Sequence, residues 1–179
     1  TSFIFQRAIL PVVVGFTVIC GVAVPTSRAA EGDSVAPAVM TEPVRSAVDK
    51  GLAFLAERQT HEGALGTSGY GRNAAVCALA GMAWLAGGST PDRGPYGREL
   101  TRVTDFLLDH TQPSGFITVA DAESHGPMYG HGFATLYLAE VYGMSPRDDL
   151  RDKLQRAVEL IVRTQNAEGG WRYQPRPED

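Results

Sequence analysis

The amino-acid sequence predicts an all-α fold, specifically an α/α toroid of which this chain carries about two and a half outer/inner helix pairs. Gln59, Gln112 and Gln165 lie 53 residues apart, and each precedes a turn with glycine and a large apolar residue. An amphipathic segment comes before each glutamine, and two nearly uncharged segments rich in alanine and glycine lie between them. Self-similarity with a period of about 50 residues indicates an array of supersecondary units.

Residues 1–29 are expected to be a secretory signal peptide. Arg7 precedes an apolar run from Ala8 to Val24, and Ser27 and Ala29 supply the small residues that signal peptidases require before a cleavage site after Ala29. The apolar run is also nearly long enough for a membrane anchor, which stays open as the alternative. The segment therefore predicts export to a bacterial periplasm or cell surface, with membrane contact only through residues 1–29.

Charge and cysteine content narrow the class of protein further. The formal net charge is −4, and removal of residues 1–29 with their two arginines makes it −6. A negative chain gives no electrostatic basis for binding nucleic acid. Cys77 is the only cysteine beyond residue 29, so no disulfide can form within the exported chain. This combination fits a bacterial exported protein better than a disulfide-rich secreted domain.

The first helical unit follows a linker. Residues 30–43 mix small, acidic and proline residues without a period, which predicts a linker. Residues 44–58 then show a helical pattern with one apolar face and form the first predicted outer helix. Residues 72–87 carry no charge after Arg72, and a helix that is apolar nearly all round is buried, so this segment is the first predicted inner helix.

The second unit and the beginning of the third repeat this order. Residues 98–111 and 150–164 are the further outer helices, and residues 132–143 form the second inner helix. At the 53-residue offset the outer helices share one small and two large apolar positions at spacing i, i+3, i+4, which place them on one helical face. These positions are Gly51, Phe54 and Leu55, then Thr104, Leu107 and Leu108, then Ala157, Leu160 and Ile161.

The repeated turn has a structural interpretation. A glutamine at the end of a helix can hydrogen-bond the unpaired backbone groups found there. Glycine allows the positive φ of a turn, and tryptophan covers the helix packing with a large apolar surface. We expect this structural role for seven residues: Gln59, Gly63, Gln112, Gly115, Gln165, Gly169 and Trp171.

An outer helix ending in Gln-x-x-x-Gly-x-Trp, followed by an inner helix of small residues, resembles the prenyltransferase and squalene-oxidase repeat of terpenoid cyclase-like proteins. Lys50-Gly51-Leu52-Ala53-Phe54-Leu55 before Gln59, and the turn at residues 128–134, resemble exported bacterial relatives of that family. The resemblance covers residues 44–175, so residues 44–179 are interpreted as the N-terminal part of a toroid domain. We expect a complete toroid to need further helix pairs, so either the natural protein continues beyond residue 179, which is the simpler interpretation and makes this chain a fragment, or the half seen here associates with something else.

The resemblance implies a central cavity that holds an apolar or isoprenoid-like ligand. Cyclases of this type use an Asp-x-Asp-Asp acid motif, and prenyltransferase β-subunits use an Asp-x-Cys zinc pair; neither motif occurs here. Enzymatic activity is therefore uncertain, the catalytic residues are unknown, and no cofactor is predicted. Asp-Asp-x-x-Asp occurs at residues 148–152. It lies at the start of a predicted outer helix, where the helix dipole stabilises acidic side chains, so we interpret it as structural.

Four residues are candidates for ligand binding: His131, Tyr129, Arg72 and Tyr70. They lie in the turns that enter the two inner helices, where a toroid has one mouth of its cavity. A histidine, an arginine and two phenols at that mouth could bind a polar or anionic group with the help of the helix N-termini. Alternatively, His131 caps its own turn. Alternating polar residues at 121–125 are typical of a loop, and no metal site is predicted.

Two functions follow from these observations. The first is an exported repeat protein that binds an apolar small molecule in a central cavity and acts on it by carbocation chemistry. The second is a non-catalytic exported toroid that serves as a binding or scaffold module. No protein partner can be named from the sequence.

Overall fold

The structure, a computed structural model, describes residues 40–177. The predicted signal peptide and most of the predicted linker lie outside the described residues. The described part contains six helical elements and no strand: α1 (Glu42–Arg58), η1 (Gly69–Arg72), α2 (Ala74–Ala86), α3 (Gly97–Asp109), α4 (Pro127–Tyr142) and α5 (Asp148–Arg163). The predicted all-α class is thus confirmed for the described residues. None of these helices combines the length and apolar character needed to cross a bilayer.

The five α-helices match the five predicted helical segments, with differences at their ends. α1 begins at Glu42, so the last two residues of the predicted linker belong to the helix, with Pro43 in its first turn. Proline is accepted there because its missing N–H has no helical partner in any case. α4 begins at Pro127, five residues before the predicted start, for the same reason. α5 begins at Asp148 and has its acidic residues in the first turn.

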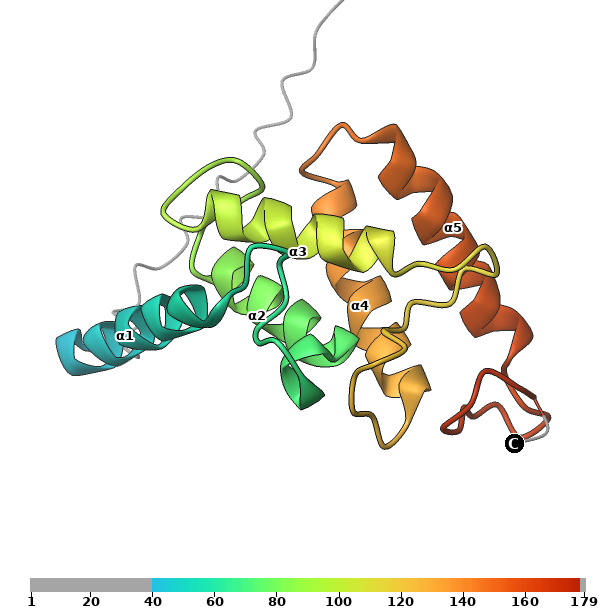
Figure 1. Ribbon diagram of the computed structural model, residues 1–179. Coiled ribbons are helices and arrows are strands. Elements are labelled where there is room, and N and C mark those ends of the chain that lie inside the picture. Colours follow the sequence, from blue (N-terminus) through green and yellow to red (C-terminus); the bar gives the residue numbers. More distant parts are fainter. Residues whose placement is uncertain (1–39, 178–179) are drawn as a thin grey trace, which may run out of the picture. The chain divides into compact units, whose positions relative to one another are not determined.

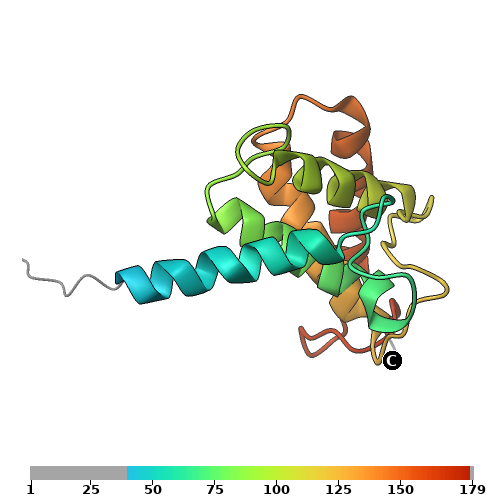
Figure 2. The same cartoon turned by 60° about the vertical axis from the view of Figure 1, so that its left-hand side comes forward.

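The two apolar helices α2 and α4 pack against each other, and the amphipathic helices lie around them. α1 packs on α2, α5 packs on α4, and α3 contacts both α2 and α4. Figure 1 shows α3 crossing the pair, with α1 and α5 on opposite sides of it. Figure 2 shows α1 extending away from the other helices toward its N-terminal end. α1 has a single buried residue, Leu52, whereas α3 buries more than half of its length.

Small residues allow the close approach of α2 and α4. A Cβ at Gly81 of α2 would lie 2.8 Å from Cζ of Tyr137 in α4, and closer still to another atom of that ring. The tyrosine ring therefore occupies space that only glycine leaves free. Tyr137 is fully buried, as is Trp84 on α2. Alanine and glycine in the inner helices thus serve packing between the helices rather than helix formation alone.

The apolar helices α2 and α4 each also bind the amphipathic helix before them, α1 and α3, through one aromatic side chain. Trp84 Nε1 donates a hydrogen bond to the Leu52 carbonyl oxygen of α1 at 3.2 Å. Tyr137 Oη donates to the Leu100 carbonyl oxygen of α3 at 3.1 Å and also lies 2.9 Å from Thr104 Oγ1. Both aromatic groups are buried, so these bonds satisfy polar atoms that could not otherwise remain in the core.

The repeated turn has the same backbone geometry in all three copies. Gly63, Gly115 and Gly169 have φ of 102°, 88° and 83°. In each copy the glycine N–H bonds the carbonyl three residues earlier, at 3.0, 2.9 and 3.0 Å. These values of φ are unfavourable for any residue with a Cβ, so the glycine is required by the backbone.

The register of the repeat differs from the one predicted through the glutamines. Hydrogen bonds across the turns join Thr60 N to Ala64 O, and Gln112 N to Phe116 O. Gln112 therefore corresponds to Thr60 and not to Gln59. The structural offsets follow the glycines and are 52 residues from the first turn to the second and 54 from the second to the third. The glutamines are evenly spaced only because Gln112 lies one residue later in its turn than Gln59 and Gln165 do in theirs, while the turns themselves are unequally spaced.

Candidate functional site

His131, the leading candidate for ligand binding, is fully buried at the N-terminal end of α4. Its Nδ1 accepts a hydrogen bond from the Ile117 N–H at 3.2 Å, and its Nε2 lies 3.1 Å from the Ala157 carbonyl oxygen of α5. Because Nδ1 is an acceptor, the proton resides on Nε2, which donates to Ala157. The Phe116 ring packs 5.5 Å from the imidazole, measured between ring centroids.

This environment keeps His131 neutral. Burial lowers its pKa to about 4, and the nearby charge of Arg163 acts in the same direction, while the bond to Ala157 opposes the shift. Neither ring nitrogen is free for a ligand. The sequence placed His131 at the mouth of a cavity; the structure instead places it where the second turn, α4 and α5 meet. Its role in binding stays a prediction, and its observed contacts are those of a packing residue.

Arg72 lies at the corresponding entrance to α2 and is held by acidic neighbours. Its Nη1 bonds Glu62 at 2.8 Å, and its Nε lies 3.4 Å from Asp121 Oδ2. The bond to Glu62 raises the pKa of Arg72, and the same bond lowers the pKa of Glu62. The guanidinium carbon also lies 5.6 Å from the centre of the Phe106 ring. The positive charge is therefore compensated before any anionic ligand arrives.

The rings of the two tyrosine candidates pack on other residues, although Tyr70 belongs to the same short helix η1 as Arg72. The Tyr70 ring packs 5.8 Å from the His125 ring, and the Tyr129 ring packs edge-on 5.7 Å from Tyr173. Both tyrosines are exposed. The described contacts of the four predicted residues therefore form separate clusters, and none joins His131 to Arg72, Tyr70 or Tyr129. Ligand binding by the four as one site remains a prediction without a shared cavity.

The structural residues of the turn bond nearby carbonyl groups, and Gln59 also reaches α3. Gln59 Nε2 donates to the Glu99 carbonyl oxygen of α3 at 2.9 Å, and Gln165 Nε2 donates to Gly169 O at 2.8 Å. Trp171 Nε1 donates to the Ile161 carbonyl oxygen of α5 at 2.7 Å. These side chains therefore bind carbonyl groups of the turn or of a helix end. For Gln112 the side chain is exposed, consistent with its different place in the register.

The inner helices carry an exposed apolar stripe that the sequence did not single out. On α2 it includes Val76 and Leu79, and on α4 it includes Phe133 and Leu136. The spacing of three residues within each pair puts its members on one face. Because α2 and α4 pack against each other, the two stripes belong to neighbouring helices. We name these four residues the inner face.

A hollow lies at the C-terminal ends of the same two helices. It has a volume of about 280 Å³ and is lined by Met82, Leu85, Ala86, Glu140 and Met144. All of these except Glu140 are apolar. The hollow is open to solvent and continues the apolar character of the inner helices at one end. The sequence signal for it was the lack of charge in the inner helices, which was interpreted only as burial.

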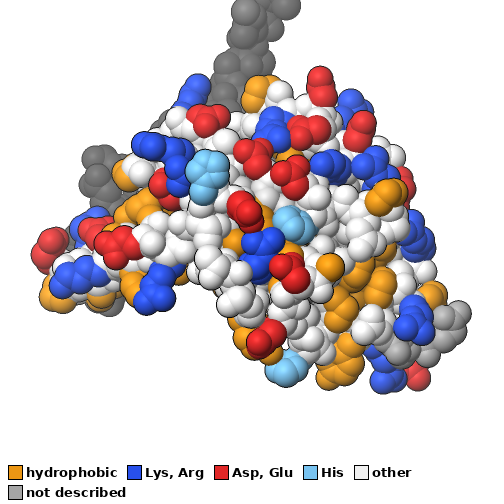
Figure 3. All heavy atoms as spheres, viewed as in Figure 1, with side chains coloured by type: hydrophobic (Ala, Val, Ile, Leu, Met, Phe, Trp, Pro, Cys, Tyr) orange, Lys and Arg blue, Asp and Glu red, His pale blue; other side chains and the backbone are white. Residues whose placement is uncertain are grey.

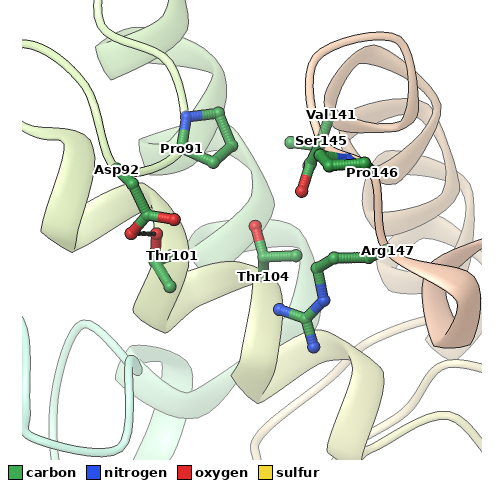
Figure 4. Close-up of a pocket in the computed structure, with 8 residues that line it drawn as sticks. All are labelled: Pro91, Asp92, Thr101, Thr104, Val141, Ser145, Pro146 and Arg147. Atoms are coloured by element: carbon green, nitrogen blue, oxygen red, sulfur yellow. Dashed lines mark hydrogen bonds between the residues drawn. The ribbon is translucent and has the colours of Figure 1, made fainter.

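A second pocket lies between α3 and the loops that enter α3 and α5, and it was also missed. It has a volume of about 220 Å³ and lies between Pro91 and Asp92 on one side and Ser145 to Arg147 on the other (Figure 4). Asp92 has φ of 61° and accepts a hydrogen bond from Thr101 Oγ1 at 2.8 Å. Figure 4 shows the Arg147 side chain directed toward the α3 side of the pocket.

The arginine and two of the three hydroxyl groups of this pocket are already paired. Arg147 forms ion pairs with Asp105 and Asp149, which raise the pKa of the arginine. The same contact lowers the pKa of Asp149. Thr104 at the floor donates to the Leu100 carbonyl oxygen at 2.8 Å. A pocket whose arginine and most of whose hydroxyl groups are paired within the protein offers little to a polar ligand, and we regard it as the junction of two loops.

Residues 40–177 contain no group of three or more histidine, cysteine or acidic side chains placed to hold an ion. Cys77 is fully buried, and burial raises the pKa of its thiol to about 11. Its Sγ contacts the Gly71 carbonyl oxygen at 3.6 Å. The thiol is therefore protonated and packed in the core.

Comparisons with known proteins identify no relative. No family model, no curated protein and no solved structure matches the chain. The surface gives one further observation: Figure 3 shows acidic and basic side chains interspersed over the face that it draws, with hydrophobic side chains between α4 and the C-terminal segment. Among the described residues, the inner face is the best candidate for a binding surface.

Proposed function

We propose that this chain is part of an exported α/α toroid of the squalene cyclase and prenyltransferase repeat type, which binds an apolar small molecule on its inner helices. The order of outer and inner helices, with inner helices packed against each other, supports the toroid arrangement. In such an arrangement the free sides of the inner helices line the central cavity. The ligand would be an isoprenoid or a compound of similar apolar chemistry.

The exposed inner face is the observation that carries this proposal. Val76, Leu79, Phe133 and Leu136 are all large apolar residues with more than a third of their surface exposed. Single exposed apolar residues are ordinary, but an adjoining set on two packed helices indicates a binding surface. The adjacent hollow of about 280 Å³ is also mainly apolar. Apolar pockets with few polar groups are the usual sites of small-molecule binding.

The alternative is a non-catalytic binding or scaffold toroid, and specific observations favour it over an enzyme. The chain has neither the acid motif nor the zinc pair of the resembling families. Its only cysteine beyond residue 29 is buried with a raised pKa, and its most buried histidine has both nitrogens bonded. The proposal is therefore for binding, with no reaction assigned to these residues.

Fluorescence of an apolar probe tests the proposal. We expect N-phenyl-1-naphthylamine to bind the folded chain saturably and farnesol to displace it. Replacement of Leu79 and Leu136 by serine should weaken binding of the probe by roughly tenfold or more, because each removes a large apolar side chain from the site. Val44→Ser is the matched control, since Val44 is equally exposed but lies on α1.

The proposal would be wrong if the probe binds weakly and without saturation, or if Val44→Ser reduces binding as much as the inner-face variants do. Circular dichroism at 222 nm would confirm that each variant remains helical. Binding that saturates but is not displaced by farnesol would contradict the isoprenoid-like ligand.

A further inference from the structure

Each of the first two turns of the repeat rests on the next outer helix along the chain. A Cβ at Gly63 would lie 2.6 Å from the Arg102 carbonyl carbon of α3, and a Cβ at Gly115 would lie 2.8 Å from the Ala157 nitrogen of α5. Backbone meets backbone at both places, and only glycine leaves the necessary room. The two junctions are therefore one kind of interface, used twice.

The positions of the turn glycines determine which residues correspond in the three outer helices. With offsets of 52 and 54 residues, the two positions beneath the turn correspond as follows: Lys50, Arg102 and Arg156; Phe54, Phe106 and Leu160. The correspondence rests only on turn geometry. Side-chain exposure can therefore be used to test it.

Exposure shows that α1 lacks the turn that the other two outer helices carry. Phe106 is 2% exposed and Leu160 3% exposed, whereas Phe54 is 53% exposed. A Cβ at Gly51 would meet no atom within 4 Å. We name Lys50, Gly51 and Phe54 the acceptor edge, because they match the surface on which a turn is seated elsewhere.

The third turn shows the opposite situation, because no described helix lies beneath it. Val162 on α5 is 68% exposed, whereas Leu108, its counterpart on α3, is 1% exposed. Trp171 is 46% exposed. At Gly169 a Cβ would meet only the side chain of Gln165, at 3.8 Å. We name Val162, Gln165, Gly169 and Trp171 the donor edge.

The glutamine of the turn shows which bond is missing. Gln59 Nε2 contacts the carbonyl oxygen of its own turn glycine at 3.4 Å and the Glu99 oxygen of the next outer helix at 2.9 Å. Gln165 makes only the first kind of bond. On the acceptor edge, the counterpart of Glu99 is Ala47, one turn before Lys50.

We propose that a second copy of this chain joins these edges, with the donor edge of one copy seated on the acceptor edge of the next. The chain carries both halves of an interface that it already uses twice internally. Figure 1 places α1 and the turn after α5 at opposite sides of the helical unit, so the two edges do not meet within one copy. The inference does not depend on a ligand for the inner face.

The geometry of association follows from the edges. Two different surfaces meet, so the interface is heterologous and builds either a closed ring or an open chain. Val162, Trp171 and Phe54 would supply its apolar contacts, and Gln165 Nε2 would reach the Ala47 carbonyl oxygen. Gly51 corresponds to Val103 on α3 and Ala157 on α5, both fully buried, and on α1 its position is open, since a Cβ there would meet no atom within 4 Å.

One contact of the second internal junction is absent from the first, where Asp109 takes the place of Arg163, and it also lacks a counterpart in the proposed interface. Arg163 Nη2 of α5 donates to the Ser114 carbonyl oxygen of the second turn at 2.7 Å. The residue that corresponds to Arg163 on α1 is Glu57, which cannot donate. Glu57→Arg should therefore restore the contact and tighten association by roughly tenfold, the value of a charge-assisted hydrogen bond.

Sedimentation velocity of the full chain tests the proposal. We expect the wild-type chain to sediment as an assembly of two or more copies. Val162→Arg removes the donor edge and Gly51→Arg fills the acceptor edge, and each should reduce the mass to that of one copy. Leu136→Arg is the matched control, because it places the same charge on an exposed apolar site outside both edges.

Mixing distinguishes this interface from any other association. Val162→Arg chains keep the acceptor edge, and Gly51→Arg chains keep the donor edge. An equimolar mixture should therefore form a dimer with one copy of each, although neither variant associates alone. Circular dichroism on the same samples would show that both variants are folded.

The proposal is overturned by a wild-type chain that remains a single copy at about 100 μM, a concentration at which even a weak specific complex forms. An assembly whose mass is unchanged by both edge variants overturns it too, since the chains would then associate through another segment, such as the apolar residues 8–24. A mixture of Val162→Arg and Gly51→Arg chains that stays monomeric would overturn the proposal as well.

Discussion

Replacement of Gly115 by alanine tests the seating of the repeated turn on the next outer helix. Gly115 has φ of 88°, and a Cβ there would lie 2.8 Å from the Ala157 nitrogen and closer still to the Arg156 backbone. Both atoms belong to the backbone of α5, so no side-chain rotation can relieve the contact. The turn must move away from α5, or α5 must move away from the core.

Two costs add at this position. A residue with a Cβ in the left-handed region costs about 1 kcal/mol relative to glycine. Overpacking against a fixed backbone costs a further ~1–3 kcal/mol. We therefore expect Gly115→Ala to lower the free energy of unfolding by about 3 kcal/mol. His131 lies in the same junction, so a displaced turn would also strain its bond to Ile117.

Urea unfolding followed by circular dichroism at 222 nm measures this effect. Gly88→Ala is the matched control, because Gly88 has nearly the same φ, 87°, with no atom within 4 Å of a Cβ. The control should cost only the conformational part, about 1 kcal/mol. If Gly115→Ala and Gly88→Ala destabilise the protein equally, the turn does not rest on α5 and the repeated junction is wrong.

Three further predictions concern buried polar groups. The pKa of His131 is about 4 in the folded state and 6.5 in the unfolded state, so the folded state binds fewer protons as the pH falls. The free energy of unfolding should therefore fall by about 3 kcal/mol between pH 7 and pH 4. Urea unfolding at both pH values should show a smaller fall for His131→Gln. Trp84→Phe leaves the Leu52 carbonyl oxygen without its indole donor and should cost about 2 kcal/mol, with faster hydrogen exchange confined to α1; exchange that rises evenly over all helices would contradict this. Tyr137→Phe and Thr104→Val should each cost about 1 kcal/mol, and a double-mutant cycle should show coupling above 0.5 kcal/mol, the approximate lower limit for residues in contact.

The sequence predicted the fold well where its signal was periodic. The spacing of apolar residues located all five α-helices, and the contrast between amphipathic and uncharged segments distinguished α1, α3 and α5 from α2 and α4. Such patterns reflect which faces of a helix are buried, because buried positions are mostly apolar and exposed positions mostly polar. Helix ends were less accurate, because proline in the first turn extended α1 and α4 beyond the last periodic residue.

The register of the turn could not be obtained from residue identity. Gln112 aligned with Gln59 by spacing, yet Thr111 occupies the equivalent place in the structure. Likewise Ile117, which is fully buried, takes the place of Trp171 in the second turn. The polar and apolar residues at these two positions differ among the three turns, whereas a glycine with positive φ is present in each. The glycine was therefore the better marker of the repeat.

The candidate site was the part least accessible from sequence. His131 was selected because a histidine at a helix entrance often contacts ligands, and its burial depends on packing from α5, which is distant in sequence. The sequence does not reveal the inner face, because a lack of charge indicates burial without showing that one side of each helix stays exposed. Only the arrangement of neighbours shows that Leu79 and Leu136 remain exposed.

The same reasoning explains why apolar residues on the outer helices differ so much in exposure. A repeat unit encodes the contacts of an average unit in the array, and each residue keeps that polarity whether or not a neighbour is present. Phe54 and Val162 are apolar because Phe106 and Leu108, at the same positions, are buried by adjoining units. Their exposure on α1 and α5 therefore identifies the two surfaces to which a further unit of the same kind is complementary.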